Sequence, residues 1–167
     1  AHLAAAFGES EGPGHRGPGR YGRKDTIMKA LLIPVGEAPR EVEVIGLADL
    51  QALVGGCIEP AGWVCENSPT LYVNDEGKAN GMLPNRAVYV TAEEAGSRKW
   101  DGGVWVEGEV IDILYGPIVA IGFDPATGED RDITPEEADR VRERFSGSFE
   151  ADNSGAIEYL NIVGSIR

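Results

Sequence analysis

The pattern of apolar and polar positions predicts two strands and a helix near the start of the chain body. The run KALLIPV, residues 29–35, is apolar up to a Pro-Val-Gly break, which is typical of a buried strand. The run REVEVIG, residues 40–46, alternates valine with glutamate, which is the period of a strand with one exposed face. Leu47, Leu50 and Val54 then share one face of a short amphipathic helix, which two glycines end.

The middle of the chain predicts further strands. We expect two of them in the segments 57–66 and 70–74, while RAVYV, residues 86–90, fits either a strand or a helix. The segment 103–123 is rich in valine and isoleucine and is broken by glycines and a proline. We therefore expect two strands in it, the second at Ile118–Phe123.

Capping patterns predict two helices in the second half, and a hairpin ends the chain. Thr91 and Glu94 have the spacing of a capping box, which favours a short helix. Thr134 is followed by a proline and by Glu137 three positions later, which is the pattern of a helix start. The segment 149–166 predicts a β-hairpin that turns at an Asn-Ser-Gly sequence.

These elements predict the fold class α+β, with a mostly antiparallel or mixed β-sheet and two or three short helices. Residues 1–27 are dense in glycine, proline and charge, so we expect a disordered lead-in there: a tag, a linker or an over-extended start. The first methionine is Met28, and residues 28–167 are expected to form a single domain.

The charge of the chain bears on its partners. The formal net charge is −13, and residues 28–167 hold 11 basic and 25 acidic side chains. Such a body repels nucleic acid, whose binding requires basic side chains, but it can attract a basic protein partner or simply be well solvated. No apolar run is long enough to cross a bilayer and no basic-then-apolar leader opens the chain, so we expect no membrane partner and a cytoplasmic location.

The sequence lacks the residues of most catalytic sites. Both histidines, His2 and His15, lie in the lead-in, which removes Ser–His and Cys–His pairs and histidine metal sites from the body. The body of the chain also lacks the two common glycine-rich motifs that bind phosphate groups, G-x-x-x-x-G-K-(S/T) and G-x-G-x-x-G. An enzyme would depend on carboxylates, tyrosine, lysine or cysteine alone, so we do not expect an enzyme, and we expect no cofactor and no metal. Cys57 and Cys65 fit two buried free thiols better than a disulfide.

Residues 150–161 partly match a calcium-binding loop. Glu150, Asp152 and Ser154 occupy the positions of its first three ligands, and Gly155 occupies the sharp turn. The twelfth position, which requires a bidentate glutamate, holds Asn161. The plain hairpin turn is therefore the favoured interpretation.

The segment LYVNDEGKANGMLPNRAV, residues 71–88, is the candidate binding region. Its Asn-Asp-Glu-Gly cluster is good turn chemistry and needs no ligand. Yet Lys78 and Arg86 are two of few basic side chains in the body, and they flank a loop that could hold an anion or a carboxylate. The candidate binding residues are Tyr72, Asn74, Lys78, Asn85 and Arg86.

An ordered set of short motifs runs through the body of the chain. In order, they are Ala30–Val35, Glu43, Leu50–Gly55, Ile58-Glu59-Pro60, Tyr72-Val73-Asn74, Glu76-Gly77-Lys78, Pro84-Asn85-Arg86 and Leu114-Tyr115-Gly116-Pro117. Together they resemble the domain of unknown function 3846, a family of actinobacteria, their phages and other mobile elements. The resemblance covers about residues 28–140, and the tail from Phe145 onward looks like an addition. It implies a small soluble accessory protein and supplies no catalytic residues.

Three hypotheses about function are left. The first is a non-enzymatic accessory protein that acts through protein–protein contact, countering a host defence or imitating DNA with the eleven carboxylates between Asp101 and Asp139. The second is a small-ligand-binding protein that uses the Asn74–Arg86 loop. The third is a carboxylate-based enzyme.

Overall fold

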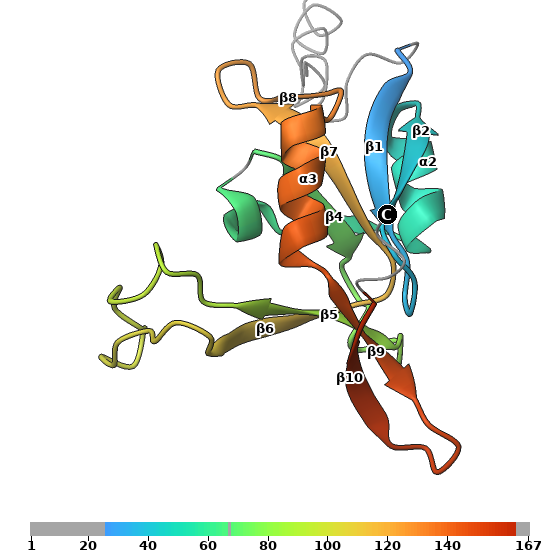
Figure 1. Ribbon diagram of the computed structural model, residues 1–167. Helices are drawn as coiled ribbons and strands as arrows, with labels where there is room; N and C mark the ends of the chain where they lie inside the picture. Colours follow the sequence, from blue (N-terminus) through green and yellow to red (C-terminus); the bar gives the residue numbers. More distant parts are fainter. Residues whose placement is uncertain (1–25, 67, 163–167) are drawn as a thin grey trace, which may run out of the picture.

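The computed structural model describes residues 26–66 and 68–162, so most of the predicted lead-in, residues 1–27, lies outside the described residues. The fold is α+β with antiparallel strands, as predicted (Figure 1). Its elements are β1 (Met28–Ile33), β2 (Arg40–Val44), α2 (Gly46–Val54), β3 (Ile58–Pro60), the 3-10 helix η1 (Gly62–Cys65), β4 (Thr70–Asn74), β5 (Pro84–Tyr89), β6 (Val110–Tyr115), β7 (Ile118–Asp124), β8 (Glu129–Arg131), α3 (Pro135–Arg144), β9 (Gly147–Ala151) and β10 (Ile157–Asn161).

The main sheet has the strand order β2-β1-β7-β4-β3, and β8 pairs with the far end of β7. Helix α3 lies on one face and α2 on the other (Figure 1). Along β1, Leu31 and Ile33 pack in the cluster with α3, while Ala30 and Leu32 pack in the cluster with α2. Because both faces are covered, the central strands are apolar at almost every position, which explains the unbroken KALLIPV run.

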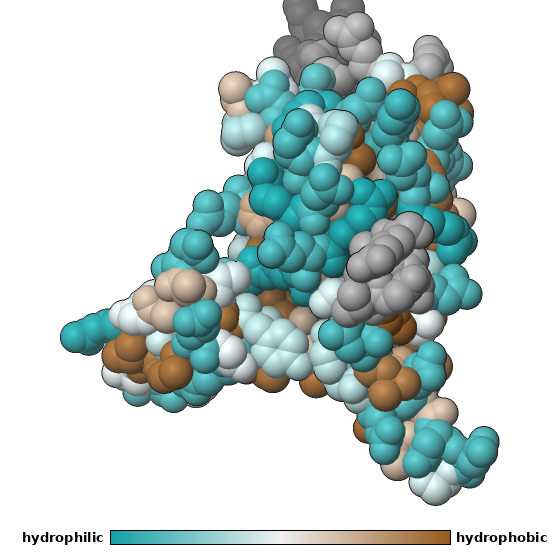
Figure 2. Space-filling view, in the orientation of Figure 1, coloured by the Kyte–Doolittle hydropathy of each residue, from teal (hydrophilic) through white to brown (hydrophobic). Residues whose placement is uncertain are grey.

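Two antiparallel strand pairs extend away from this sheet (Figure 1). One is β5–β6, whose connecting loop carries Trp100 with 96% of its surface exposed. The other is the hairpin β9–β10, and β9 lies beside β5. Figure 2 shows apolar residues on both pairs, whereas the face over α3 is mostly hydrophilic. The two pairs therefore present apolar surface at a distance from the main core.

Several local predictions are confirmed. Gly55 ends α2 in the left-handed conformation. For the segment 86–90, which fitted either a strand or a helix, the structure decides in favour of strand, since residues 86–89 form the end of β5. Thr134 begins α3 with a complete capping box to Glu137. The hairpin at the end of the chain turns at residues 153–155. No helix within the described ranges is long and apolar enough to span a membrane.

Other local predictions need correction. The capping box at Thr91 forms its hydrogen bonds, but the chain there is a turn and not a helix. The segment 57–66 forms only a short strand, followed by η1. Both cysteines are free, but Cys57 is exposed instead of buried, while burial raises the pKa of the Cys65 thiol. The short strand β8 was not predicted at all, because three charged residues give no apolar pattern.

Candidate functional site

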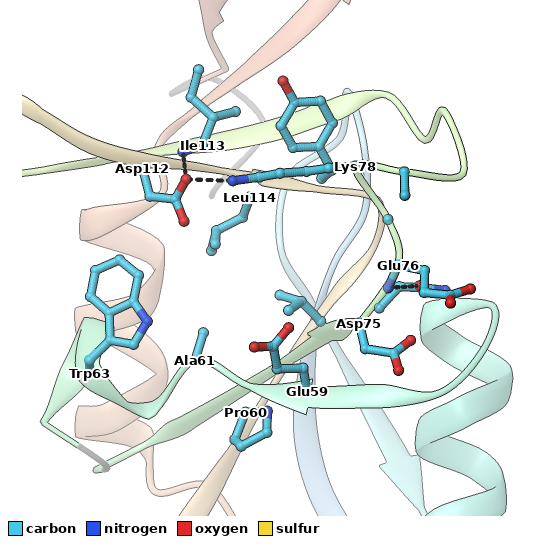
Figure 3. A pocket seen from close by; sticks show the side chains of 15 residues that line it. Glu59, Pro60, Ala61, Trp63, Asp75, Glu76, Lys78, Asp112, Ile113 and Leu114 are labelled. Carbon is cyan, nitrogen blue, oxygen red and sulfur yellow. Dashed lines mark hydrogen bonds and ion pairs between the residues drawn. The ribbon is translucent and has the colours of Figure 1, made fainter.

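A cleft of about 370 Å³ lies between the β3–η1 segment, the loop after β4 and strand β6 (Figure 3). In Figure 3, Glu59 and Trp63 border one side of the cleft, and Lys78 reaches along the opposite side to Asp112. The polar and aromatic side chains of the lining are Glu59, Trp63, Asn74, Asp75, Glu76, Lys78, Asp112 and Tyr115.

Asn74 fixes the loop that forms the edge of the cleft. Its side-chain oxygen accepts a 2.9 Å hydrogen bond from the Glu76 backbone N–H, which is an Asx turn. Its side-chain nitrogen donates 3.3 Å to the carbonyl of Val54 at the end of α2. Asn74 is 7% exposed, so its role is to hold the loop rather than to meet a ligand directly.

Lys78 joins the loop to strand β6. Its Nζ lies 2.7 Å from Oδ1 of Asp112 and 5.7 Å from the centre of the Tyr115 ring. The same Asp112 oxygen accepts a 2.8 Å hydrogen bond from the Ile113 backbone N–H. The Lys78 side chain is 59% exposed, so a charged group entering the cleft can compete for this ion pair.

The charge of the lining favours a cation. The residues of the lining carry four carboxylates, those of Glu59, Asp75, Glu76 and Asp112, and one ammonium group, that of Lys78. Trp63 is 47% exposed and supplies an aromatic face at the border of the cleft. Carboxylates next to an accessible indole form a good environment for a lysine, an arginine or an amine.

The structure brings together only two of the five predicted binding residues, Asn74 and Lys78. Tyr72 is buried, and its hydroxyl lies 3.0 and 2.9 Å from the two carboxylate oxygens of Asp130, to which it donates. Asn85 is also buried and donates 2.8 Å hydrogen bonds to two backbone carbonyls, those of Ile33 and Gly116. Tyr72 and Asn85 therefore form hydrogen bonds inside the protein and do not line the cleft.

Arg86 is fully buried at the junction of β5, α3 and the β1–β2 turn. Its guanidinium donates to the backbone carbonyls of Pro34, Glu37, Asn85 and Phe145 at 3.3, 2.6, 3.3 and 3.0 Å. It also donates a 2.6 Å hydrogen bond to the side-chain oxygen of Asn85. Burial lowers the pKa of the guanidinium to about 10, so it is charged at neutral pH and is held by neutral carbonyls.

Sequence reasoning missed Glu59, Trp63 and Asp112 as members of the site. Glu59 and Trp63 reach the cleft through the pairing of β3 with β4, and Asp112 reaches it through the pairing of β6 with β5. Local pattern gives no information on such long-range neighbours. The only available signal was the Trp63 side chain on a segment that is otherwise apolar and Gly-punctuated.

The calcium-like segment is a hairpin turn. Oδ1 of Asp152 accepts hydrogen bonds from the backbone N–H groups of Ser154 and Ala156 and from the Ser154 hydroxyl, at 2.8, 2.9 and 2.6 Å. The Ser154 hydroxyl is the largest of the contacts that lower the pKa of this carboxyl. Across the part of the chain that the structure describes, no three His, Cys, Asp or Glu side chains are grouped to hold a metal ion.

Comparison with known proteins gives one family match. The model of a family described as a domain of unknown function (DUF3846) matches residues 28–146. No curated protein and no solved structure matched the chain. The matched residues contain the main sheet, both helices and the cleft, whereas the β9–β10 hairpin lies beyond their end.

Proposed function

The chain belongs to the family described as a domain of unknown function (DUF3846), as its motifs predicted, and we propose that it is a non-enzymatic protein that binds a basic segment of a partner protein. The cleft accepts a lysine or arginine side chain of that partner. The observation that carries the proposal is the charge of the lining, whose residues carry four carboxylates and one ammonium group that already has an ion pair.

In the absence of a partner, Lys78 and Asp112 form an ion pair with each other in the cleft. An incoming cation competes with Lys78 for the Asp112 carboxylate, and Lys78 is exposed enough to turn toward solvent. The incoming group also gains contact with the indole of Trp63, and with Glu59, which has no ion pair among the described residues. Binding of a basic side chain therefore breaks one ion pair within the protein, Lys78–Asp112, and forms several new contacts in its place.

An accessory role in a phage or mobile element fits this binding activity, since such proteins act by occupying a host component. The support for it is the family resemblance together with the net charge of −13. Imitation of DNA is less well supported than binding in the cleft. The carboxylates between Asp101 and Asp139 are spread over the β5–β6 loop, strands β6, β7 and β8, the segment before α3 and α3 itself, and those of Asp130 and Glu137 are buried.

A small cationic molecule is the second candidate, because the cleft volume is within the ~300–1,000 Å³ of small-molecule sites. Carboxylate-based hydrolysis is not proposed. Glu59, Asp75 and Glu76 are exposed to solvent, and no pair of buried carboxylates lines the cleft in the described residues.

Isothermal titration of the full chain with hexalysine, and separately with spermidine, tests the proposal at about 0.15 M salt. We expect hexalysine to bind, and Glu59→Gln and Trp63→Ala each to weaken binding by about tenfold, which corresponds to about 1.4 kcal/mol. Glu41→Gln is the matched control, because Glu41 is exposed on β2 at the opposite edge of the sheet.

Lys78→Ala separates the two kinds of ligand. If the cleft binds a cation, this substitution removes the competitor at Asp112 and raises the affinity for hexalysine. If the loop holds an anion, the same substitution abolishes binding of acetate or phosphate. Equal affinity of hexalysine for the cleft variants and for Glu41→Gln would show only diffuse attraction to an acidic protein, and the proposal would fail.

A further inference from the structure

Strand β10 is an exposed sheet edge. It pairs with β9 on one side, and no strand in the described residues pairs with its other side. All five of its residues are exposed, including three apolar ones: Ile157, Tyr159 and Leu160 are 52%, 37% and 38% exposed. A strand of this kind is a template for pairing with another chain.

The hydrogen bonds of the hairpin show which backbone groups lie at the free edge. The Asp152 N–H donates to the carbonyl of Ala156 at 2.8 Å, and the Ile162 N–H donates to the carbonyl of Ser146 at 3.0 Å. In an antiparallel ladder the bonded residues alternate, so the even-numbered residues of β10 bond to β9. The N–H and C=O groups of Ile157 and Tyr159 therefore point to the outer edge.

The two faces of the hairpin differ in chemistry. On one face the Tyr159 ring packs edge-on against Phe149 and Tyr89, with ring centroids 4.9 and 6.0 Å apart. On the other face Glu158 stands directly opposite Glu150 in the register. Like charges directly opposite each other destabilise a strand pair, and neither glutamate has an ion pair within the described residues.

We propose that the free edge of β10 binds an extended segment of a basic protein partner by β-strand addition. The segment has an apolar–basic–apolar order. Its basic side chain lies beside Glu158 and offsets the repulsion from Glu150, while the flanking apolar side chains lie beside Ile157 and Tyr159. This goes beyond the proposed function, because the surface is separate from the cleft and belongs to a hairpin outside the family match.

Charge decides between a basic partner and a second copy of the chain. A second copy also carries a net charge of −13, and its own β10 would bring another Glu158 to the same edge, with another Glu150 on the strand behind it. A basic segment brings the opposite sign to two carboxylates that have no ion pair within the described residues. Strand β2 is also a sheet edge with exposed glutamates, but its valines lie against the α2 face, so it lacks exposed apolar positions.

The test uses a capped seven-residue peptide of alternating valine and lysine, with fluorescence anisotropy on the full chain. We expect the peptide to bind and to slow hydrogen exchange of the outward amides of Ile157 and Tyr159. Glu158→Lys is expected to weaken binding at least tenfold and to allow binding of a peptide of alternating valine and glutamate. This variant also pairs Glu150 with a cation, so we expect the hairpin to stay folded.

Two controls separate this surface from other causes. Glu41→Lys makes the same charge change on the β2 edge and should leave binding unchanged. Because the cleft is itself proposed to bind lysine, the titrations are repeated in the Trp63→Ala background, where Glu158→Lys should still weaken peptide binding at least tenfold. The proposal is overturned if Trp63→Ala abolishes binding, if Glu158→Lys has no effect, or if a peptide N-methylated at alternate residues binds equally well. A dimer in sedimentation that Glu158→Lys strengthens would assign the edge to a second copy and would equally overturn it.

Discussion

The Nε–H group of Arg86 donates a 3.0 Å hydrogen bond to the backbone carbonyl of Phe145, the residue at which α3 ends. A positive charge at the C-terminal end of a helix is favourable, because the last carbonyls carry partial negative charge. The same guanidinium also bonds to the carbonyls of Pro34 and Glu37. One side chain thus connects three segments that lie far apart in the sequence.

We expect Arg86→Met to lower the free energy of unfolding by about 3 kcal/mol, because it leaves several buried carbonyls without donors. Urea unfolding of the full chain measures this change. Lys78→Met is the control: its ion pair with Asp112 is exposed, so we expect a change within about 0.5 kcal/mol. Equal effects of the two substitutions would contradict a structural role for Arg86.

Glu137 gives a pH dependence to stability. Burial alone would raise the pKa of its carboxyl, but hydrogen bonds from Arg131, the Thr134 backbone and Ser68 outweigh burial and lower the pKa from 4.5 to about 2. Because the folded value lies below the unfolded one, the stabilisation is complete above about pH 4.5 and is lost as the pH falls toward 2.

We therefore expect Glu137→Gln to reduce the free energy of unfolding by about 2 kcal/mol at pH 7, and by much less near pH 2. Arg131 is partly exposed, which is why the figure is smaller than the full pKa shift implies. Glu136→Gln, in the same first turn but exposed, should show neither the loss nor its pH dependence. Thermal unfolding at pH 2 and pH 7 compares the two.

Gly147 makes room for the Tyr159 ring. A Cβ atom at this position would overlap the ring atoms of Tyr159, so we expect Gly147→Ala to displace the ring and loosen the β9–β10 hairpin. Faster hydrogen exchange in residues 148–160 reports the change. In a Tyr159→Ala background the ring is absent, and Gly147→Ala should then have little further effect. An undiminished effect in that background would show a backbone cause instead.

Two capping boxes in the chain predict different losses. Thr134→Ala removes the N-cap of α3, and we expect a loss of about 1 kcal/mol. Thr91→Ala removes the same kind of hydrogen bond from a surface turn, so we expect less than about 0.5 kcal/mol, the usual range for surface changes. Denaturation midpoints of the two variants give the comparison, and a larger loss for Thr91→Ala would contradict it.

These two threonines also show how far sequence pattern reaches. Both form the capping hydrogen bonds that the spacing predicts, but only Thr134 precedes residues with an apolar face, Ala138 and Val141, that can pack on the sheet. After Thr91 the chain runs AEEAGSRKWDGG, which offers no such face, and it stays a turn. A cap determines where a helix can start, while tertiary packing determines whether it forms.

The candidate site is less predictable than the sheet, because it depends on tertiary contacts that the local sequence does not show. The alternation in β2 and the apolar run of β1 depend on each strand's own two faces, so they are visible locally. The positions of Asp112 and Arg86 depend on partners 34 and 59 residues away. Arginine is rarely fully buried, so a pattern-based interpretation placed Arg86 on a binding loop.

The central place of β7 in the sheet has a consequence for synthesis on the ribosome. Strand β7 joins β1 to β4, yet it is made after both, and its residues follow β4 by more than forty positions. Until residue 124 has left the exit tunnel, the β1–β2 and β3–β4 pairs have no strand to connect them, and both keep open edges. The nascent chain therefore passes through a long stage in which these edges are unpaired, and the sheet closes only when β7 is inserted between strands that are already present.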